Sequence, residues 1–333
     1  MILRAFLDGI KRTVSAPAVL LGVMLVTMAM ALPLALTLRG MLEGHLGTSL
    51  AAHDAAEGVN HDWWQEFQAQ AAGLGTTFTP SVIGFAAVLD NISSVLDAER
   101  EIAPVTGALG AYLLVWTFLS GGIVDRFARR RPTRAHGFFA ASGVFFFRFL
   151  RLAVAAGLVY WFLFGVVHGW LFDDLYRDVT REVNVERAAF AWRAALYLVF
   201  GALLVLANVL FDYARIRAVV EDRRSMIVTL LASARFVVRH PRLVFGLYAL
   251  NALAFLALLA LWAVLAPGAG RAGLSMWLGI GLAQAYLAAR LFLKLHFIAS
   301  QTALFQATLA HAGYTAAPAA VWPESPSAEA IHA

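Results

Sequence analysis

Long runs of apolar residues dominate the chain, and polar positions gather in the short segments between them. Within these runs apolar and polar side chains do not alternate with a period of two, so half-buried β-strands are not expected. A helix of about 20 apolar residues is long enough to cross the hydrocarbon core of a bilayer. Several runs reach that length, so the pattern predicts an all-α polytopic membrane protein.

Six segments are predicted to be transmembrane helices. They are residues 14–38, 103–124, 152–172, 191–212, 243–266 and 274–299. The first segment follows basic residues, as in a signal peptide, but its apolar run exceeds the roughly 7 to 15 residues of a secretory signal. We therefore interpret it as a retained span. An even number of spans places both termini on the same side of the membrane.

The distribution of charge predicts the orientation. Residues 126–151 and 215–242 each contain seven arginines, whereas residues 39–104 contain nine acidic residues and two arginines. Basic loops stay on the cytoplasmic side of a membrane. We therefore expect both termini and the arginine-rich segments in the cytoplasm, residues 39–102 in an external loop, and the protein in a bacterial inner membrane.

Composition narrows the classes of function. Hydrophobic residues make up 61% of the chain and charged residues 14%, with a net charge of +5 and no cysteine. Disulfides and thiolate sites are excluded, and the position of the arginines between apolar runs favours membrane orientation over nucleic-acid binding. Residues 1–312 are predicted to form one transmembrane domain. Residues 313–333, rich in Ala, Pro and Ser, are predicted to be a disordered cytoplasmic tail.

One phrase occurs twice in the chain. Residues 141–152 read ASGVFFFRFLRL and residues 232–243 read ASARFVVRHPRL, with the same residue at six of twelve positions. On a helix, each copy places its arginines in a narrow stripe opposite an apolar face that includes Phe146 in the first copy, and Leu230 and Val237 in the second. Such helices lie in the membrane interface, with arginines near phosphates and apolar side chains among acyl chains.

These stripes supply the candidate contacts to lipid headgroups. The residues are Arg148, Arg151, Arg235, Arg239 and Arg242. Pro241 predicts a bend between the second interfacial helix and the following span, because proline restricts the residue before it and lacks a backbone donor. Leu150 occupies the equivalent place in the first copy.

Residues 6–19 resemble the second copy more weakly, with Lys11 at the place of Arg235 and Pro17 at the place of Pro241. The chain then divides into three units, each an interfacial helix followed by a transmembrane hairpin. The alternative is a chance similarity between amphipathic helices rich in Ala, Phe and Arg.

The segment FLSGGIVDRFARRRPTRAHGFFAASGVFFFRFLRL, residues 118–152, resembles a recurring feature of uncharacterised bacterial six-span proteins. These are related to the membrane domain attached to some glycerophosphodiester phosphodiesterases. The resemblance implies a six-span layout in which a Gly-Gly pair closes one span and an amphipathic helix leads into the next. It does not imply the enzymatic activity, because a barrel of ~250 residues has no room in this chain.

Polar residues in or near the predicted spans form a second candidate site, because such residues are costly in a membrane unless paired or hydrated. They are Asn208, Asp212, Arg215, Asn251, Gln284, Arg290 and Lys294. We hypothesise that Asp212 pairs with Arg290 or Lys294 beside a vestibule for an anionic group such as a lipid phosphate. The alternative is a purely structural salt bridge.

No catalytic, cofactor or metal site is predicted. The chain contains no GxSxG, Walker or HExxH motif, and His45, His53 and His61 are spaced by eight residues, which does not stack them on one helical face. The small residues Gly121–Gly122, Gly279 and Gly281 are predicted to allow close helix packing.

The sequence favours a non-enzymatic role in binding lipids or organising the membrane, with anionic lipid headgroups as the partners and no protein partner indicated. A transporter or channel for a lipid or small anion is the main alternative. It requires a hydrated cavity lined by Asn208, Asn251 and Gln284. An intramembrane enzyme on lipid phosphates is a weaker alternative, since it needs clustered histidines and carboxylates and the third span offers His168 alone.

Overall fold

The computed structural model describes residues 1–47, 49–57, 60–79, 86–99, 102–130, 132–267 and 273–309. Within these residues every regular element is helical. Six helical segments are long and apolar enough to cross a membrane, so the chain is an all-α polytopic membrane protein, as predicted. The predicted tail, residues 313–333, lies outside the described residues.

Five of these segments are single helices. They are α2 (Pro17–Leu46), α6 (Ala103–Arg129), α9 (Glu186–Val220), α11 (Pro241–Leu265) and α12 (Leu274–Thr308). The sixth is the helical run 135–180. It consists of α7 (Ala135–Phe162), the π-helical segments η3 (Leu163–Val167) and η4 (Trp170–Leu175), and α8 (Tyr176–Thr180). The helices overlap all six predicted spans. Most helices are longer than the predicted spans, because a hydropathy pattern detects only the apolar part of a helix and not its polar ends.

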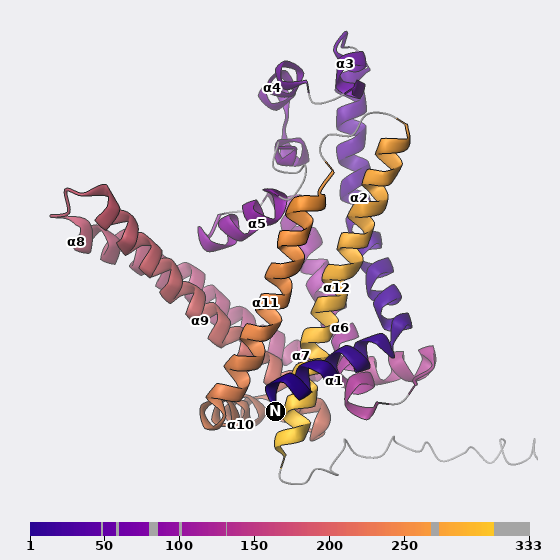
Figure 1. Cartoon of the computed structure of the whole chain (residues 1–333), viewed down its shortest axis with the longest axis vertical. Coiled ribbons are helices and arrows are strands. Elements are labelled where there is room, and N and C mark those ends of the chain that lie inside the picture. Colours follow the sequence, from indigo (N-terminus) through magenta and orange to yellow (C-terminus); the bar gives the residue numbers. More distant parts are fainter. Residues whose placement is uncertain are drawn as a thin grey trace, which may run out of the picture.

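Two shorter helices, α1 (Ile2–Val14) and α10 (Met226–Arg239), lie across one end of the long helices (Figure 1). We call this end, which also holds the last turns of α6, α9 and α12, the basic end. The segment 39–102, predicted as an external loop, contains helical elements near the opposite end. They are α3 (Ala52–Glu57), α4 (His61–Gln70), the 3-10 helix η1 (Gly73–Thr77) and α5 (Ala86–Leu96).

Helices α6, α9 and α12 form the centre of the bundle, and each contacts the other two. Each also packs against one amphipathic segment at the basic end: α6 against α7, α9 against α10, and α12 against α1. The arrangement is therefore cyclic. The hairpin made by α7 to α9 leans away from the other long helices toward its far end (Figure 1).

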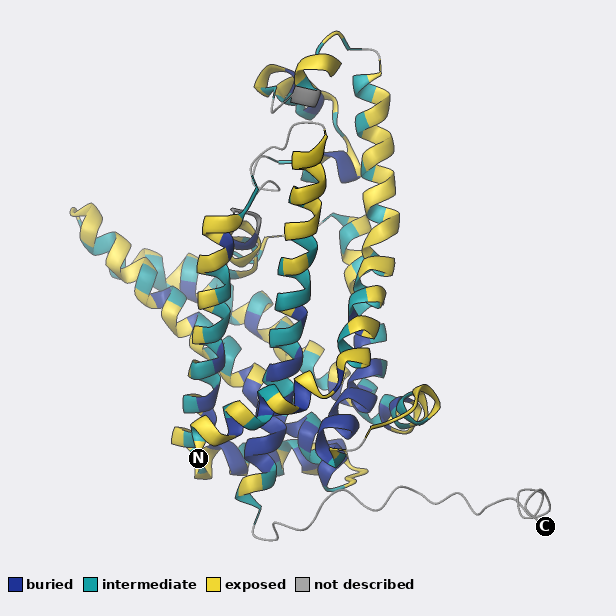
Figure 2. Ribbon diagram, turned by 45° about the vertical axis from the view of Figure 1, so that its right-hand side comes forward, coloured by how far each residue is buried: buried dark blue, intermediate teal, exposed yellow. Residues whose placement is uncertain are grey.

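The best buried part of the molecule is the basic end (Figure 2). All residues from Leu119 to Ala128 of α6 and from Ala299 to Phe305 of α12 are buried. Toward the opposite end, apolar side chains such as Leu198 and Val264 are 76% and 82% exposed. Apolar surface of this kind suits contact with acyl chains, and the packed core beneath it fixes the helices relative to one another at the basic end.

The two copies of the repeated phrase differ in structure. In the second copy α10 ends at Arg239 and α11 begins at Pro241, so the predicted bend is present. Residues 6–19 show the same break, because α1 ends at Val14 and α2 begins at Pro17. The first copy forms no separate helix and lies within α7, since Leu150 keeps the backbone N–H that proline lacks.

The Gly-Gly pair packs as predicted. A Cβ atom at Gly122 would lie 2.5 Å from Ser142 Oγ, and one at Gly121 would lie 3.0 Å from Phe145 Cβ, so only glycine allows α7 to approach this closely. The same prediction is wrong for Gly281, where an added Cβ would meet nothing within 4 Å. At Gly279 the nearest atom, on Pro267, would be at an ordinary contact distance of 3.5 Å.

Candidate lipid-headgroup site

Helix α10 presents three different faces. The face packed against the protein consists of Met226, Thr229, Ser233, Phe236 and Val237. A second face is apolar and exposed, and consists of Ile227, Leu231 and Val238. The third face carries Arg235 and Arg239, one helical turn apart and both exposed. A helix that is apolar on one exposed side and basic on the adjacent side matches the gradient between hydrocarbon and headgroups.

Arg242, in the first turn of α11, extends the basic face of α10. It is exposed like Arg235 and Arg239. Within the described part of the chain, none of the three arginines forms an ion pair or a side-chain hydrogen bond. Their guanidinium groups are therefore available to an anion from outside the protein.

The exposed apolar face of α10 is not the one expected from the sequence. Val237 is 4% exposed and Leu230 packs against the protein core, so these residues face the interior. The stripe opposite the arginines is apolar, as predicted, but α9 covers it. Ile227, Leu231 and Val238 lie between the two faces and remain exposed.

The first copy of the phrase uses its arginines differently. Arg148 donates to Asp222 Oδ1 at 2.6 Å, and its side chain is only 14% exposed. It also lies over the ring of Phe145, 5.1 Å from the ring centroid. Arg151 is exposed and donates to the carbonyl of Phe147 in its own helix. Arg148 therefore fixes α7 to the loop before α10, while Arg151 remains accessible.

Helix α1 repeats the three faces of α10. Its buried face is Ala5, Gly9, Arg12 and Thr13, and its exposed apolar face is Leu3, Leu7 and Val14. Lys11 is exposed and stands where the aligned α10 segment has Arg235. The two helices therefore meet their surroundings in the same way.

Of the predicted polar cluster, Arg215 pairs with Asp212, whereas Arg290 and Lys294 form no ion pair with it in the described structure. The nearest basic group to Asp212 Oδ1 is Arg215 Nη1 of the same helix, at 3.6 Å, and Gln301 Nε2 approaches Oδ2 at 3.5 Å. Lys294 instead donates to Tyr112 Oη at 3.0 Å and lies 3.5 Å from a ring centroid of Trp116. The hypothesised pair with Lys294 is replaced by these aromatic contacts.

The other predicted partner, Arg290, is exposed and lies 5.8 Å from the ring centroid of Tyr286. It forms no ion pair with Asp212 in the described structure. Both Arg290 and Lys294 thus lie over aromatic rings, whose faces attract cations.

The amide residues of the cluster have different surroundings. Asn208 accepts a hydrogen bond from Tyr160 Oη at 3.1 Å, while Asn251 is 3% exposed and donates to Ser300 Oγ at 3.1 Å. The Oε1 atom of Gln284 is buried and has no hydrogen-bond partner in the described part of the chain. Asn251 therefore links α11 to α12.

A cavity of about 410 Å³ lies between α6, α7 and α9. Arg215 and Tyr160 supply polar groups, whereas Trp116, Phe149 and Phe211 supply apolar walls. Of the seven residues predicted to form the polar cluster, only Arg215 lines this cavity.

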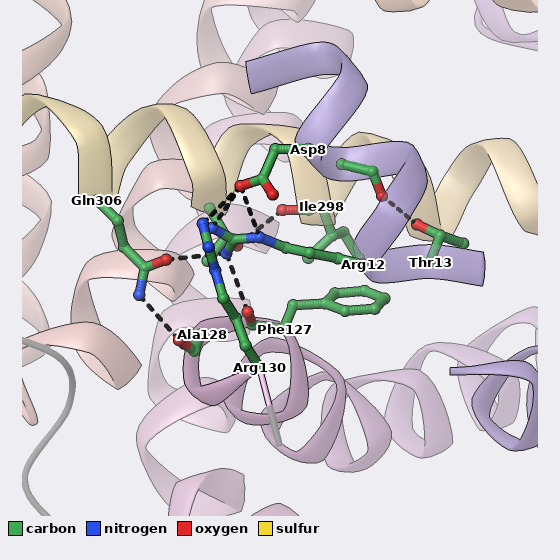
Figure 3. Close-up of polar contacts among 10 residues, drawn as sticks. Asp8, Arg12, Thr13, Phe127, Ala128, Arg130, Ile298 and Gln306 are labelled. Carbon is green, nitrogen blue, oxygen red and sulfur yellow. Dashed lines mark hydrogen bonds and ion pairs between the residues drawn. The ribbon is translucent and has the colours of Figure 1, made fainter. Parts of the chain in front are cut away.

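A buried polar network that the sequence reading did not identify joins α1, α6 and α12 (Figure 3). Arg12 is 4% exposed, and its guanidinium donates to Asp8 Oδ2 at 2.9 Å, to the Phe127 carbonyl at 2.9 Å and to Gln306 Oε1 at 2.8 Å. Gln306 in turn donates to the Ala128 carbonyl at 3.0 Å. The i, i+4 spacing of Asp8 and Arg12 was the available signal in the sequence.

The network supplies hydrogen-bond acceptors for the buried guanidinium group of Arg12. Burial lowers the pKa of Arg12, and the nearby charge of Asp8 opposes this shift. An arginine stays protonated in proteins, so Arg12 acts here as a fixed positive charge. Arg130, the residue directly after α6, has a left-handed backbone conformation and also donates to Asp8 Oδ2, at 2.6 Å. An adjoining cavity of about 830 Å³ is lined by Arg4, Asp8, Arg129 and Arg130 among others.

The histidines do not form a metal site in the described part of the chain, where no group of three His, Asp or Glu residues could hold a metal ion. Nδ1 of His45 accepts from Trp63 Nε1 at 3.0 Å, and His168 contacts the Leu96 carbonyl at 3.0 Å. Both rings thus take part in local packing between the predicted external segment and the long helices.

The chain matches no family model, no curated protein and no solved structure. The resemblance of residues 118–152 to the membrane domain of glycerophosphodiester phosphodiesterases stays a prediction.

Proposed function

We propose that this integral membrane protein binds anionic lipid headgroups at the corner between α10 and α11, on the cytoplasmic side of a bacterial inner membrane, in a non-enzymatic role. The observation that carries the proposal is that Arg235, Arg239 and Arg242 are exposed and have no partner among the described residues, beside the exposed apolar face of α10. Apolar side chains hold this corner at the depth of the headgroups, and the arginines then face phosphates.

The expected energy is modest for each residue and substantial for the set. A basic residue near an anionic membrane surface contributes about 1 kcal/mol. Three arginines acting together contribute up to ~3 kcal/mol, equivalent to roughly a hundredfold preference for anionic over zwitterionic lipid at low salt. Screening at high ionic strength weakens this preference.

The proposal includes descent of the three units from one ancestral unit. In the alignment of the repeated phrase, the first residues of the three helices, Ile2, Ala135 and Met226, occupy equivalent positions. The buried residues Gly9, Ser142 and Ser233 are also equivalent, and each is small. The cyclic packing of α6, α9 and α12 against these segments supports the same origin.

The test uses the absence of cysteine in the chain. Ser225 is exposed, and its side chain does not cap α10, so Ser225→Cys provides a single position for a donor fluorophore. In nanodiscs, energy transfer to headgroup-labelled phosphatidylglycerol should exceed transfer to labelled phosphatidylcholine. Replacing Arg235, Arg239 and Arg242 together with glutamine should make the two transfers equal.

The matched control removes the same charge at the opposite end of the molecule. Arg177, Arg181 and Arg187 are exposed around the turn between α8 and α9. Their joint replacement with glutamine should leave the lipid preference measured at residue 225 unchanged. Equal preference for anionic lipid in the α10–α11 variant and the unaltered protein would refute the proposed site.

The transporter alternative is less well supported by the geometry. It requires Asn208, Asn251 and Gln284 to line one hydrated cavity. Asn251 is buried, however, and its side-chain amide donates to Ser300 Oγ and to the Leu247 carbonyl. The cavity beside Arg215 is the feature that favours it. If Arg215→Gln abolished anion flux in proteoliposomes without changing folding, transport would replace lipid binding as the leading function.

A further inference from the structure

A groove of about 520 Å³ opens where the start of α2 meets α6 and the start of α7. Its walls are mostly apolar. The residues along α2 are Ala16, Pro17, Ala18, Val19, Gly22, Val23, Leu25 and Val26, and those facing them include Leu119, Phe138 and Phe139. Among the described residues of the lining, Arg126 of α6 is the one charged side chain.

Arg126 is a buried cation without a carboxylate partner in the described structure. It is 7% exposed, and within the described residues its side chain forms one hydrogen bond, from Nη2 to the Ser15 carbonyl at 2.8 Å. The guanidinium group has five N–H donors, so most of its hydrogen-bonding capacity is unused. A charge removed from water is costly unless an opposite charge approaches it.

Comparable arginines elsewhere at the basic end are neutralised. Arg12 pairs with Asp8, Arg129 with Asp125, and Arg217 with Glu221. Arg217 is the instructive case, because it lies in α9 at the position aligned with Arg126 and likewise donates to a carbonyl, that of Ala232. It differs from Arg126 by having Glu221 as a counter-charge 2.9 Å away.

The backbone adds positive potential at the same place. Helix α2 has 30 residues, begins with Pro17 and receives no side-chain hydrogen bond at its N-cap, Ala16. The first turn of a helix carries the positive end of the helix dipole. Both Ala16 and Pro17 line the groove, so this helix end and Arg126 act on the same space.

We propose that the groove binds one anionic phospholipid, with its phosphate at Arg126 and the start of α2, and an acyl chain along the face from Val19 to Val26. Charge complementarity selects an anion, and the apolar walls continuing along a membrane-spanning helix select an amphiphile over a free phosphate ion. The inference deepens the proposed lipid-binding function by adding a discrete site, and it rests on the same premise that the chain meets anionic lipid.

The experiment counts lipids that stay bound to the full-length protein. Protein purified in mild detergent is incubated with phosphatidylglycerol or phosphatidylcholine and examined by native mass spectrometry. One equivalent of phosphatidylglycerol should survive activation that removes phosphatidylcholine. Arg126→Gln should lower occupancy at least about tenfold, as expected for the loss of a charge-assisted contact, and Arg126→Lys should retain most of it.

A second variant tests the acyl-chain part of the groove independently of the buried charge. A side chain at Gly22 meets no protein atom within 4 Å of its Cβ, so Gly22→Phe should fill the groove without disturbing the fold. It should also lower occupancy at least about tenfold. Gly40→Phe is the matched control, because Gly40 lies on the same helix with equally open surroundings and outside the groove.

The outcomes separate this site from the α10–α11 corner. Loss of the retained lipid in the Arg126 and Gly22 variants, with retention when Arg235, Arg239 and Arg242 are replaced, supports the groove. Retention in folded Gly22→Phe, equal retention of phosphatidylcholine, or displacement of the lipid by inorganic phosphate would overturn it. Failure of the energy-transfer test alone would remove the proposed corner and leave the groove standing.

Discussion

At the scale of single residues, this protein distinguishes arginines by their partners. Arg12 is enclosed by a carboxylate, a carbonyl and an amide oxygen, whereas Arg235 and Arg239 are exposed and unpaired in the described structure. Arg126 is intermediate, since it is buried but has no counter-charge among the residues that the structure describes. Burial and pairing therefore separate the structural arginines from those that the proposed function assigns to lipid phosphates.

The structural role of Arg12 leads to a stability prediction. Arg12→Met should lower the stability of the folded protein by about 3 kcal/mol, because it leaves the Phe127 carbonyl and Gln306 without their buried donor. The measurement is the apparent Tm in detergent. Arg4→Met is the control, since Arg4 lies on the same helix and is exposed, and it should leave Tm nearly unchanged. Equal Tm values for the two variants would contradict the structural role.

At the scale of elements, the close approach of α6 and α7 depends on Gly122. Gly122→Ala should destabilise the protein by about 1–3 kcal/mol, because its Cβ would lie 2.5 Å from Ser142 Oγ and 2.8 Å from the Phe138 carbonyl. Alanine is otherwise the better helix former. Gly107→Ala in the same helix meets nothing within 4 Å and should be neutral or stabilising. Thermal unfolding of both variants tests this contrast, and destabilisation by both would assign the effect to the helix itself.

Also at this scale, α1 and α10 show how a short helix can be amphipathic in two ways at once. One face packs on a long helix, and the remaining surface is divided between apolar and basic residues. A single stripe of charge opposite a single apolar face does not describe them. The three-way division arises because each helix contacts both protein and, under the proposed function, the membrane interface.

At the scale of the whole molecule, the positive-inside rule predicts the orientation. Ser225 lies at the basic end and Asn184 lies in the turn between α8 and α9; both are exposed. In spheroplasts, a membrane-impermeant maleimide should label Asn184→Cys directly. It should label Ser225→Cys only after the membrane is permeabilised. The reverse pattern would invert the topology and place the α10–α11 arginines on the outer face.

The whole molecule also shows where stability is concentrated. The three central helices are buried together at the basic end, while their far ends expose apolar side chains (Figure 2). The α10–α11 corner, the groove beside Arg126 and the network around Arg12 all lie at this packed end. A rigid support of this kind holds charged groups in place beside a fluid surface.

The sequence by itself determined the all-α class, the six long apolar helices and the break before Pro241. These features depend on hydropathy and on the chemistry of proline, which both act within a short stretch of the chain. The Gly-Gly contact was predictable for a similar reason, since a pair of small residues signals close packing.

Only the tertiary structure decided what each charged residue does. Arg148 and Arg239 occupy equivalent places in the repeated phrase, yet Arg148 pairs with Asp222, 74 positions away, while Arg239 remains exposed. Arg12 donates to Gln306, 294 positions away in the sequence, and Asp212 forms no ion pair with Arg290 or Lys294 in the described structure. Pairing between charged residues depends on which helix faces pack together, often between segments far apart in the sequence. The periodicity of residues within one helix carries no information about that packing.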